Sequence, residues 1–130
     1  MRTELKAEVE IQVPFHDVDA MHYVWHGHYY KYFEVVRTKL FQSIDYDVLQ
    51  MKASGYSWPI IETSCKYVQP MLYNQLIQVS AKIQEYENRL KIIYRISDAK
   101  TDEKLATGHT TQVAIDMKNN ECVLCHPSFC

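Results

Sequence analysis

Strict alternation of apolar and polar residues in the second half of the chain restricts the fold most. Over residues 77–84 every odd position is apolar and every even position is polar, and residues 90–96 place apolar residues at the even positions. A period of two is typical of strands that bury one face. Glu87 and Asn88 offer a turn between the two runs, which predicts that they pair as antiparallel neighbours.

Weaker alternation predicts further strands on both sides of these runs. The predicted segments are residues 7–13, which Pro14 ends, residues 61–67, before Pro70, and residues 105–116. Residues 119–120 are typical of a polar turn, and a short last strand is expected after them. The strands together predict an antiparallel sheet of five or six members.

One long helix is expected between the first two strands. Its apolar stripe recurs at intervals of four, three and four residues and consists of Tyr29, Phe33, Val36 and Leu40. A second, short helix is predicted from Asp45 to about Met51, with Gly55 as its stop.

The order of strand, helix, short helix and further strands places the chain in the α+β class. With 130 residues it is expected to form one domain that spans residues 1–130. One long helix cannot cover both faces of a five- or six-stranded sheet, so a face or an edge is left needing a partner. We therefore expect a homo-oligomer, at least a dimer.

Charge and apolar content limit the classes of function. The formal net charge is −2 with scattered lysines and arginines, which argues against nucleic-acid binding. Residues 1–8 lack the apolar segment of a signal peptide, and no apolar run is long enough for a membrane span. A cytoplasmic protein with reduced cysteines is expected.

The segment before the long helix carries the residues most suited to chemistry. Asp17 and Asp19 precede His22, His26 and His28. A helix N-terminus presents unpaired N–H groups and partial positive charge, which can hold an oxyanion. A carboxylate a few residues upstream can attack a carbonyl or activate water. We therefore place the candidate site at this junction.

Two stretches of the sequence match the pattern of a known family. They are Asp17-Val18-Asp19-Ala20-Met21 with Val24, His26, Tyr29 or Tyr30, and Phe33-Glu34-Val35-Val36-Arg37, and the later Tyr67-Val68-Gln69-Pro70. Over nearly the whole chain the sequence resembles the hotdog-fold acyl-CoA thioesterases of the 4-hydroxybenzoyl-CoA thioesterase family. Members wrap an antiparallel sheet around one central helix, pair into dimers and often tetramers, and hydrolyse acyl-CoA at the dimer interface.

The resemblance implies roles for individual residues. Asp19 is the catalytic carboxylate, either as a nucleophile that forms a mixed anhydride or as a general base. His26, which matches a histidine of the Tol-Pal-associated branch of short-chain acyl-CoA thioesterases, is the second candidate catalytic residue. It either orients the carbonyl, positions water or protonates the leaving thiolate, or it only caps or packs. Backbone N–H groups of His26 and Gly27 would meet the oxyanion, and no cofactor is expected.

Other residues are candidates for substrate contacts or for support. The candidate substrate-binding residues are Tyr23, Trp25, Glu62 and Thr63, and the candidate partners of the CoA phosphates are Lys66, Lys82, Arg89 and Lys91. Asp17 is expected in a structural role in the turn. Glu34 either forms an ion pair with Arg37 or ties the catalytic loop or a partner subunit in place.

One position departs from the family pattern. The family commonly has glycine where this chain has His22, and glycine there permits close approach or a positive φ. This difference favours one alternative to an acyl-CoA thioesterase, a catalytically weak hotdog protein that binds acyl-CoA or acyl chains. A second alternative is a thioesterase for acyl-carrier-protein substrates.

Two groups of residues have spacings from which metal sites can be built. One is His22, His26 and His28, and the other is Cys122, Cys125 and His126 with Cys130. At a turn before a helix the histidine rings would point apart, and the cysteine group would need the chain end folded back. We expect no metal at either.

Overall fold

The computed structural model describes residues 5–44, 53, 55–86, 89–119 and 121–124. Its strands are β1 (Lys6–Gln12), β2 (Tyr56–Ser57), β3 (Ile60–Tyr67), β4 (Leu76–Glu85), β5 (Leu90–Asp98), β6 (Lys104–Gln112), β7 (Ala114–Asp116) and β8 (Glu121–Leu124). Its helices are α1 (His28–Ser43) and the short 3-10 helix η1 (Phe15–Asp17).

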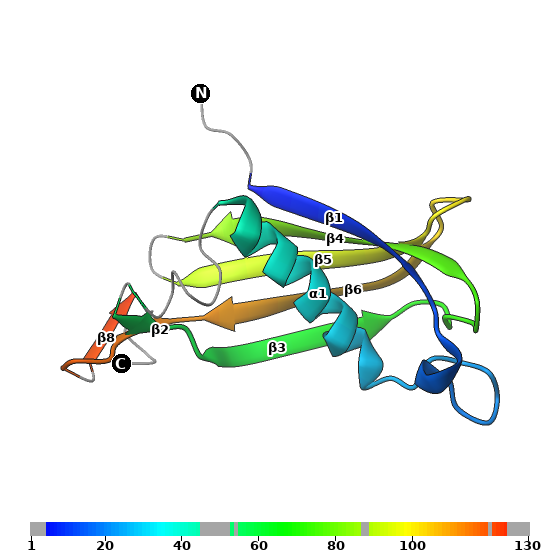
Figure 1. Ribbon diagram of the computed structural model, residues 1–130, viewed down its shortest axis with the longest axis horizontal. Coiled ribbons are helices and arrows are strands. Elements are labelled where there is room, and N and C mark those ends of the chain that lie inside the picture. Colours follow the sequence, from blue (N-terminus) through cyan, green and yellow to red (C-terminus); the bar gives the residue numbers. More distant parts are fainter. Residues whose placement is uncertain (1–4, 45–52, 54, 87–88, 120, 125–130) are drawn as a thin grey trace.

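The main sheet has five antiparallel strands in the order β1-β4-β5-β6-β3, and α1 lies across one of its faces (Figure 1). β4 and β5 pair as predicted, with Val79 opposite Ile96 and Ala81 opposite Tyr94. Their predicted turn at residues 87–88 lies outside the described residues. The predicted α+β class and hotdog fold, a sheet wrapped around one long helix, are confirmed.

The core lies between α1 and the sheet. All four residues of the predicted helical stripe are buried. Phe33 of this stripe stacks on Tyr94 of β5, with ring centroids 4.5 Å apart. A Cβ at Gly108 of β6 would lie only 2.6 Å from the Phe33 ring, so the helix can pack this closely only because position 108 has no side chain.

The predicted strand over residues 105–116 is divided in two. β6 ends at Gln112 and β7 begins at Ala114, and between them the N–H of Val113 donates to the carbonyl oxygen of Pro59 over 3.3 Å. β7 leaves the main sheet and pairs with β2 and β8 in a separate three-stranded sheet. Alternation alone could not reveal this change of partner, because both strands keep the period of two.

The outer elements agree with the sequence in part. The short last strand predicted after residues 119–120 is present as β8, whereas the two residues of β2 are too few for a pattern to show. The predicted helix from Asp45 to Met51 lies outside the described residues. Among the described residues, no helix is both long and apolar enough to cross a membrane.

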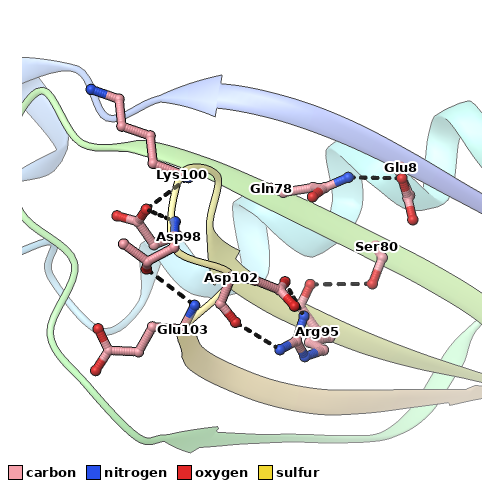
Figure 2. Close-up of polar contacts among 9 residues, drawn as sticks. Glu8, Gln78, Ser80, Arg95, Asp98, Lys100, Asp102 and Glu103 are labelled. Atoms are coloured by element: carbon pink, nitrogen blue, oxygen red, sulfur yellow. Dashed lines mark hydrogen bonds and ion pairs between the residues drawn. The ribbon is translucent and has the colours of Figure 1, made fainter.

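Asp98 holds the turn between β5 and β6. Its Oδ1 accepts the N–H groups of Lys100 at 2.8 Å and Thr101 at 2.9 Å (Figure 2). Its Oδ2 accepts the side-chain amide of Gln75 at 2.9 Å. The hydrogen bond from Gln75, followed by those from the backbone, lowers the pKa of Asp98 from 3.8 to about 2.

The edge formed by β3 is uncovered. Seven of its eight residues are exposed, and only Cys65 is half-buried. A long exposed edge strand presents unpaired backbone groups to a further strand. The predicted uncovered edge of the sheet is therefore present.

Candidate active site

The residues between η1 and α1 form a tight hairpin. The N–H of Asp19 donates to the carbonyl oxygen of Tyr23 over 2.8 Å, and the N–H of Trp25 donates to that of Asp17 over 3.1 Å. These bonds bring the start of the helix back beside the two acidic residues. The sequence predicted a turn here but not a paired hairpin.

The segment before β4 fixes this hairpin from outside. The N–H of Val24 donates to the carbonyl oxygen of Met71 over 2.8 Å, and the N–H of Tyr73 donates to that of His22 over 3.3 Å. Tyr23 and Leu72 form an isolated β-bridge between these two bonds. The hairpin is therefore part of a small hydrogen-bonded unit rather than a free loop.

Asp17 is buried in the wall that the hairpin presents to α1. Its side chain is 1% exposed, its Oδ1 accepts from Lys31 Nζ, and its Oδ2 accepts from the Tyr32 hydroxyl over 2.6 Å. Burial alone would raise the pKa of Asp17, but the bonds from Lys31 and Tyr32 and the charge of Lys31 lower it below 3.8. The carboxylate therefore stays charged, with both oxygens occupied.

Asp19 lies exposed two residues later. Its Oδ1 accepts the N–H groups of Met21 over 2.9 Å and Tyr23 over 3.3 Å. Within the described residues its Oδ2 accepts no hydrogen bond. One oxygen fixes the side chain on the backbone, and the other is open to water or to a substrate carbonyl.

His22 occupies the turn of the hairpin with a φ of 65°. This left-handed conformation is the one that glycine adopts without strain. The chain therefore follows a glycine-like path at the position where the sequence resemblance implies glycine, in spite of the His22 side chain.

The start of α1 is not capped by a side chain. Gly27 is the N-cap, with φ −67° and ψ −24°, and makes no side-chain cap hydrogen bond. Among the described residues, the N–H groups of His26 and Gly27 donate to no protein acceptor. A Cβ at Gly27 would lie 2.2 Å from the Trp25 ring, which packs directly over the N-terminus of the helix.

A cavity of about 290 Å³ lies beside this helix start. It is lined by Val24, His26 and Tyr29 and by residues 67–70. The Tyr67 hydroxyl donates to the carbonyl oxygen of His26 over 3.1 Å. Burial, with Cys65 as a further cause, raises the pKa of Tyr67 to about 12, so this hydroxyl keeps its proton. The structure thus brings together the two sequence stretches that carry the family pattern.

The predicted substrate-binding residues do not line this cavity. Tyr23 and Trp25 are exposed on the hairpin, 42% and 51% respectively. Thr63 lines a second cavity of about 160 Å³ on the helix side of the sheet, together with Glu34 and Arg37. Glu62 binds His109 instead. A single chain therefore does not gather the four predicted residues.

The ion pair predicted between Glu34 and Arg37 is not formed. Among the described ion pairs none joins these two residues, although both line the second cavity. The spacing of three residues permits the pair but does not require it. The alternative role for Glu34, toward the catalytic loop or a partner subunit, stays a prediction.

Two polar groups escaped the sequence analysis. One is the contact of Asp17 with Lys31 and Tyr32, and the other is a chain of hydrogen bonds through His109. A weak indication of the first exists, because Tyr32 and Lys31 occupy the first turns of the helix that follows the acid. Nothing in the spacing indicates the second, which depends on the register of β3 and β6.

The candidate metal groups are described only in part. Among the described residues, no three histidine, cysteine, aspartate or glutamate side chains are grouped so that they could hold a metal ion. Cys125, His126 and Cys130 lie outside the described residues.

Comparison with known proteins places these features in a wider group. A model of the Thioesterase-like superfamily matches residues 13–129. A relative from Aquifex aeolicus named "Putative esterase" is 25% identical over 112 residues, which cover 86% of this chain and 85% of the relative. A relative from Bacillus subtilis named "Putative acyl-CoA thioesterase" is 29% identical over 85 residues, 65% of this chain and 61% of the relative.

Solved structures share the fold over almost the whole chain. A 1,4-dihydroxy-2-naphthoyl-CoA thioesterase from Synechocystis superimposes with a TM-score of 0.84 at 18% identity, covering 95% of this chain and 92% of that structure. A DHNA-CoA thioesterase from Staphylococcus aureus gives 0.81 at 22% identity, covering 92% and 80%. At these identities the superpositions establish the fold alone.

Proposed function

The chain belongs to the thioesterase-like superfamily, and from this premise we propose that it hydrolyses an acyl-CoA to the free acid and CoA. The observation that carries the proposal is the cavity at the uncapped start of α1, which His26 and Tyr67 line together. Two relatives named as an esterase and an acyl-CoA thioesterase support the same chemistry.

The geometry suits attack on a thioester carbonyl. The carbonyl oxygen would lie against the free N–H groups of His26 and Gly27, where the helix N-terminus stabilises the negative charge that develops. The open Oδ2 of Asp19 would either attack the carbonyl carbon, giving a mixed anhydride that water hydrolyses, or remove a proton from attacking water. The C–S bond then breaks, and the CoA thiolate takes up a proton, for which His26 is the candidate donor.

A second copy of the chain is part of the proposal. Asp19 lines none of the three cavities among the described residues, and Glu34 and Thr63 line a different cavity from His26. The exposed edge of β3 can pair with the same strand of another copy and extend the sheet. Such a dimer, or a tetramer of two such dimers, would bring residues of the neighbouring chain to each site.

The finer identity rests on sequence resemblance. The pattern around Asp19 and Tyr67 favours the 4-hydroxybenzoyl-CoA thioesterase family, and His26 favours its Tol-Pal-associated branch. Hydrolysis of acyl-carrier-protein thioesters is the alternative activity. A catalytically weak protein that binds acyl chains is the alternative from another class, and His22 in the left-handed conformation is the observation that favours it.

A thiol-release assay on a panel of aromatic and straight-chain acyl-CoAs tests the proposal. We expect turnover that depends on acyl type, and slower turnover of the same acyl groups on a carrier protein. Faster turnover of the carrier-protein substrates would favour the alternative activity. Binding of acyl-CoA without any thiol release would contradict the enzymatic function and favour the alternative of an acyl-binding protein.

Light scattering on the purified chain tests the assembly. We expect the mass of a dimer or tetramer at micromolar concentration. A fully active monomer would contradict the shared site.

A further inference from the structure

A third cavity, of about 430 Å³, lies on the β-sheet. Its lining includes Ser64 and Lys66 of β3, Lys91 and Ile93 of β5, and Thr107 and His109 of β6. Tyr94 packs on Phe33 of α1, and side chains alternate along a strand, so Lys91 and Ile93 point to the face that α1 does not cover. This outer-face cavity is therefore separate from the cavity beside His26.

Three cationic side chains, Lys66, Lys91 and Arg95, border the outer-face cavity. Neither Lys66 nor Lys91 forms an ion pair with another described residue. Arg95, which also borders the cavity, is engaged by Asp102 through its carboxylate at 3.0 Å and its carbonyl oxygen at 3.1 Å (Figure 2). Lys66 and Lys91 are thus left to bind an anion, whereas the guanidinium of Arg95 is already bound to Asp102.

A chain of hydrogen bonds fixes the polar wall of this cavity. The Ser64 hydroxyl lies 2.8 Å from His109 Nδ1, and His109 Nε2 lies 3.0 Å from the Glu62 carboxylate. The hydrogen bond from His109 lowers the pKa of Glu62, so the carboxylate is charged and is satisfied by the imidazole. The charge of Lys91 also contributes to this shift, so Glu62 interacts with both His109 and Lys91. Glu85, which lies opposite Lys91 on β4, is engaged by Arg89.

We propose that the outer-face cavity binds the phosphate groups of a nucleotide-like phosphate ester. Lysine ammonium groups bind phosphate as point charges, and the hydroxyls of Ser64 and Thr107 can add hydrogen bonds. Ile93, two residues from Lys91 on β5 and opposite His109 of β6, supplies an apolar surface on which a base or ribose can rest. The volume lies within the range of small-molecule sites, and exceeds what a lone phosphate needs.

Two sources could supply this chemistry. One is the nucleotide end of a CoA substrate, which would have to reach from a site of a neighbouring subunit, because the cavity beside His26 is on the other side of the sheet. The other is a free nucleotide. The first source rests on the proposed function, and the second is independent of it.

Isothermal titration with adenosine 3′,5′-bisphosphate, CoA and inorganic phosphate tests the site. The test variant is Lys66→Ala with Lys91→Ala. The matched control is Lys100→Ala with Lys118→Ala, which removes the same charge from two exposed lysines outside the cavity. We expect the test variant to bind the bisphosphate about 10-fold more weakly or worse, and the control to bind like the parent. Circular dichroism checks that both variants fold.

The ligands separate the two sources. Weaker binding of both CoA and the bisphosphate supports the substrate source, and weaker binding of the bisphosphate alone supports a free nucleotide. The readout is binding, so it can succeed or fail independently of thiol release. Absence of bisphosphate binding, binding of inorganic phosphate only, or equal losses in test and control variants would overturn the proposal.

Discussion

Asp17 and Asp19 are only two residues apart, but their carboxylates lie in opposite environments. Asp17 is buried, and Lys31 and Tyr32 occupy both of its oxygens. Asp19 is exposed, and only one of its oxygens is bound, by the backbone of its own turn. A carboxylate can react only through an oxygen that is not already engaged. The difference supports the proposal that Asp17 anchors the hairpin and that Asp19 is the reactive carboxylate.

The anchor and the reactive group depend on one another. The bonds from Asp17 hold the hairpin against α1, and the N–H of Trp25 returns to the carbonyl oxygen of Asp17 at the start of the helix. A buried carboxylate costs desolvation free energy, which its charged and hydrogen-bonded partners offset. In the proposed mechanism, the buried carboxylate of Asp17 helps to position the neighbouring side chain of Asp19.

The largest effect is expected from Asp19→Asn. The amide keeps the shape and the turn but loses the nucleophilic or basic oxygen, so kcat should fall by about 10³-fold. The melting temperature should change little, because the side chain is exposed. Thiol release and thermal unfolding measure the two quantities.

Asp98→Asn is the matched control for this variant. It removes the same charge from the turn between β5 and β6, outside the candidate site, and should leave turnover as in the parent. Turnover in Asp19→Asn close to that of Asp98→Asn would remove Asp19 from the mechanism and end the contrast with Asp17.

A smaller and different effect is expected from Asp17→Asn. Loss of the charge leaves Lys31 without its ion-pair partner. The new amide NH2 group is a donor that would face the donors of Lys31 or Tyr32, so the unfolding free energy should fall by about 2 kcal/mol. Urea unfolding measures the loss. The folded variant should keep more activity than Asp19→Asn. If it unfolds like the parent but loses all turnover, Asp17 is the reactive acid instead.

The sequence was sufficient where function follows from local pattern. The buried stripe of α1, the pairing of β4 with β5 and the position of Asp19 before a helix all follow from spacing and motif. It was insufficient where distant strands or protruding loops determine a contact. The bond from His109 to Glu62 needs the register of β3 on β6, and the division of β6 from β7 needs the position of β2.

His22→Gly tests the turn on which Asp19 lies. Glycine accepts a φ of 65° without strain, so the substitution should stabilise the fold by about 1 kcal/mol, less the entropy that glycine adds to the unfolded chain. His22→Ala keeps the strain and serves as the control. In denaturant unfolding, the His22→Gly variant should have a higher unfolding free energy than both the parent and the His22→Ala variant. Equal stabilities of the Gly and Ala variants would show that the left-handed conformation costs nothing here.

The smallest effect is expected from Asp98→Asn. This variant separates the effect of side-chain exposure from the effect of having both carboxylate oxygens hydrogen-bonded. Asp98 is half-buried, and so more accessible than Asp17, but both of its oxygens accept hydrogen bonds, as in Asp17. Its pKa of about 2 lies below the ordinary 3.8, so its charged form stabilises the fold above about pH 4, and this contribution is lost as the pH falls toward 2. The parent should therefore exceed Asp98→Asn in unfolding free energy near neutral pH, and the gap should close in acid. A gap that persists unchanged at pH 2 would mean that the amide disturbs the turn by its shape, and that occupancy of the oxygens is not what the carboxylate contributes.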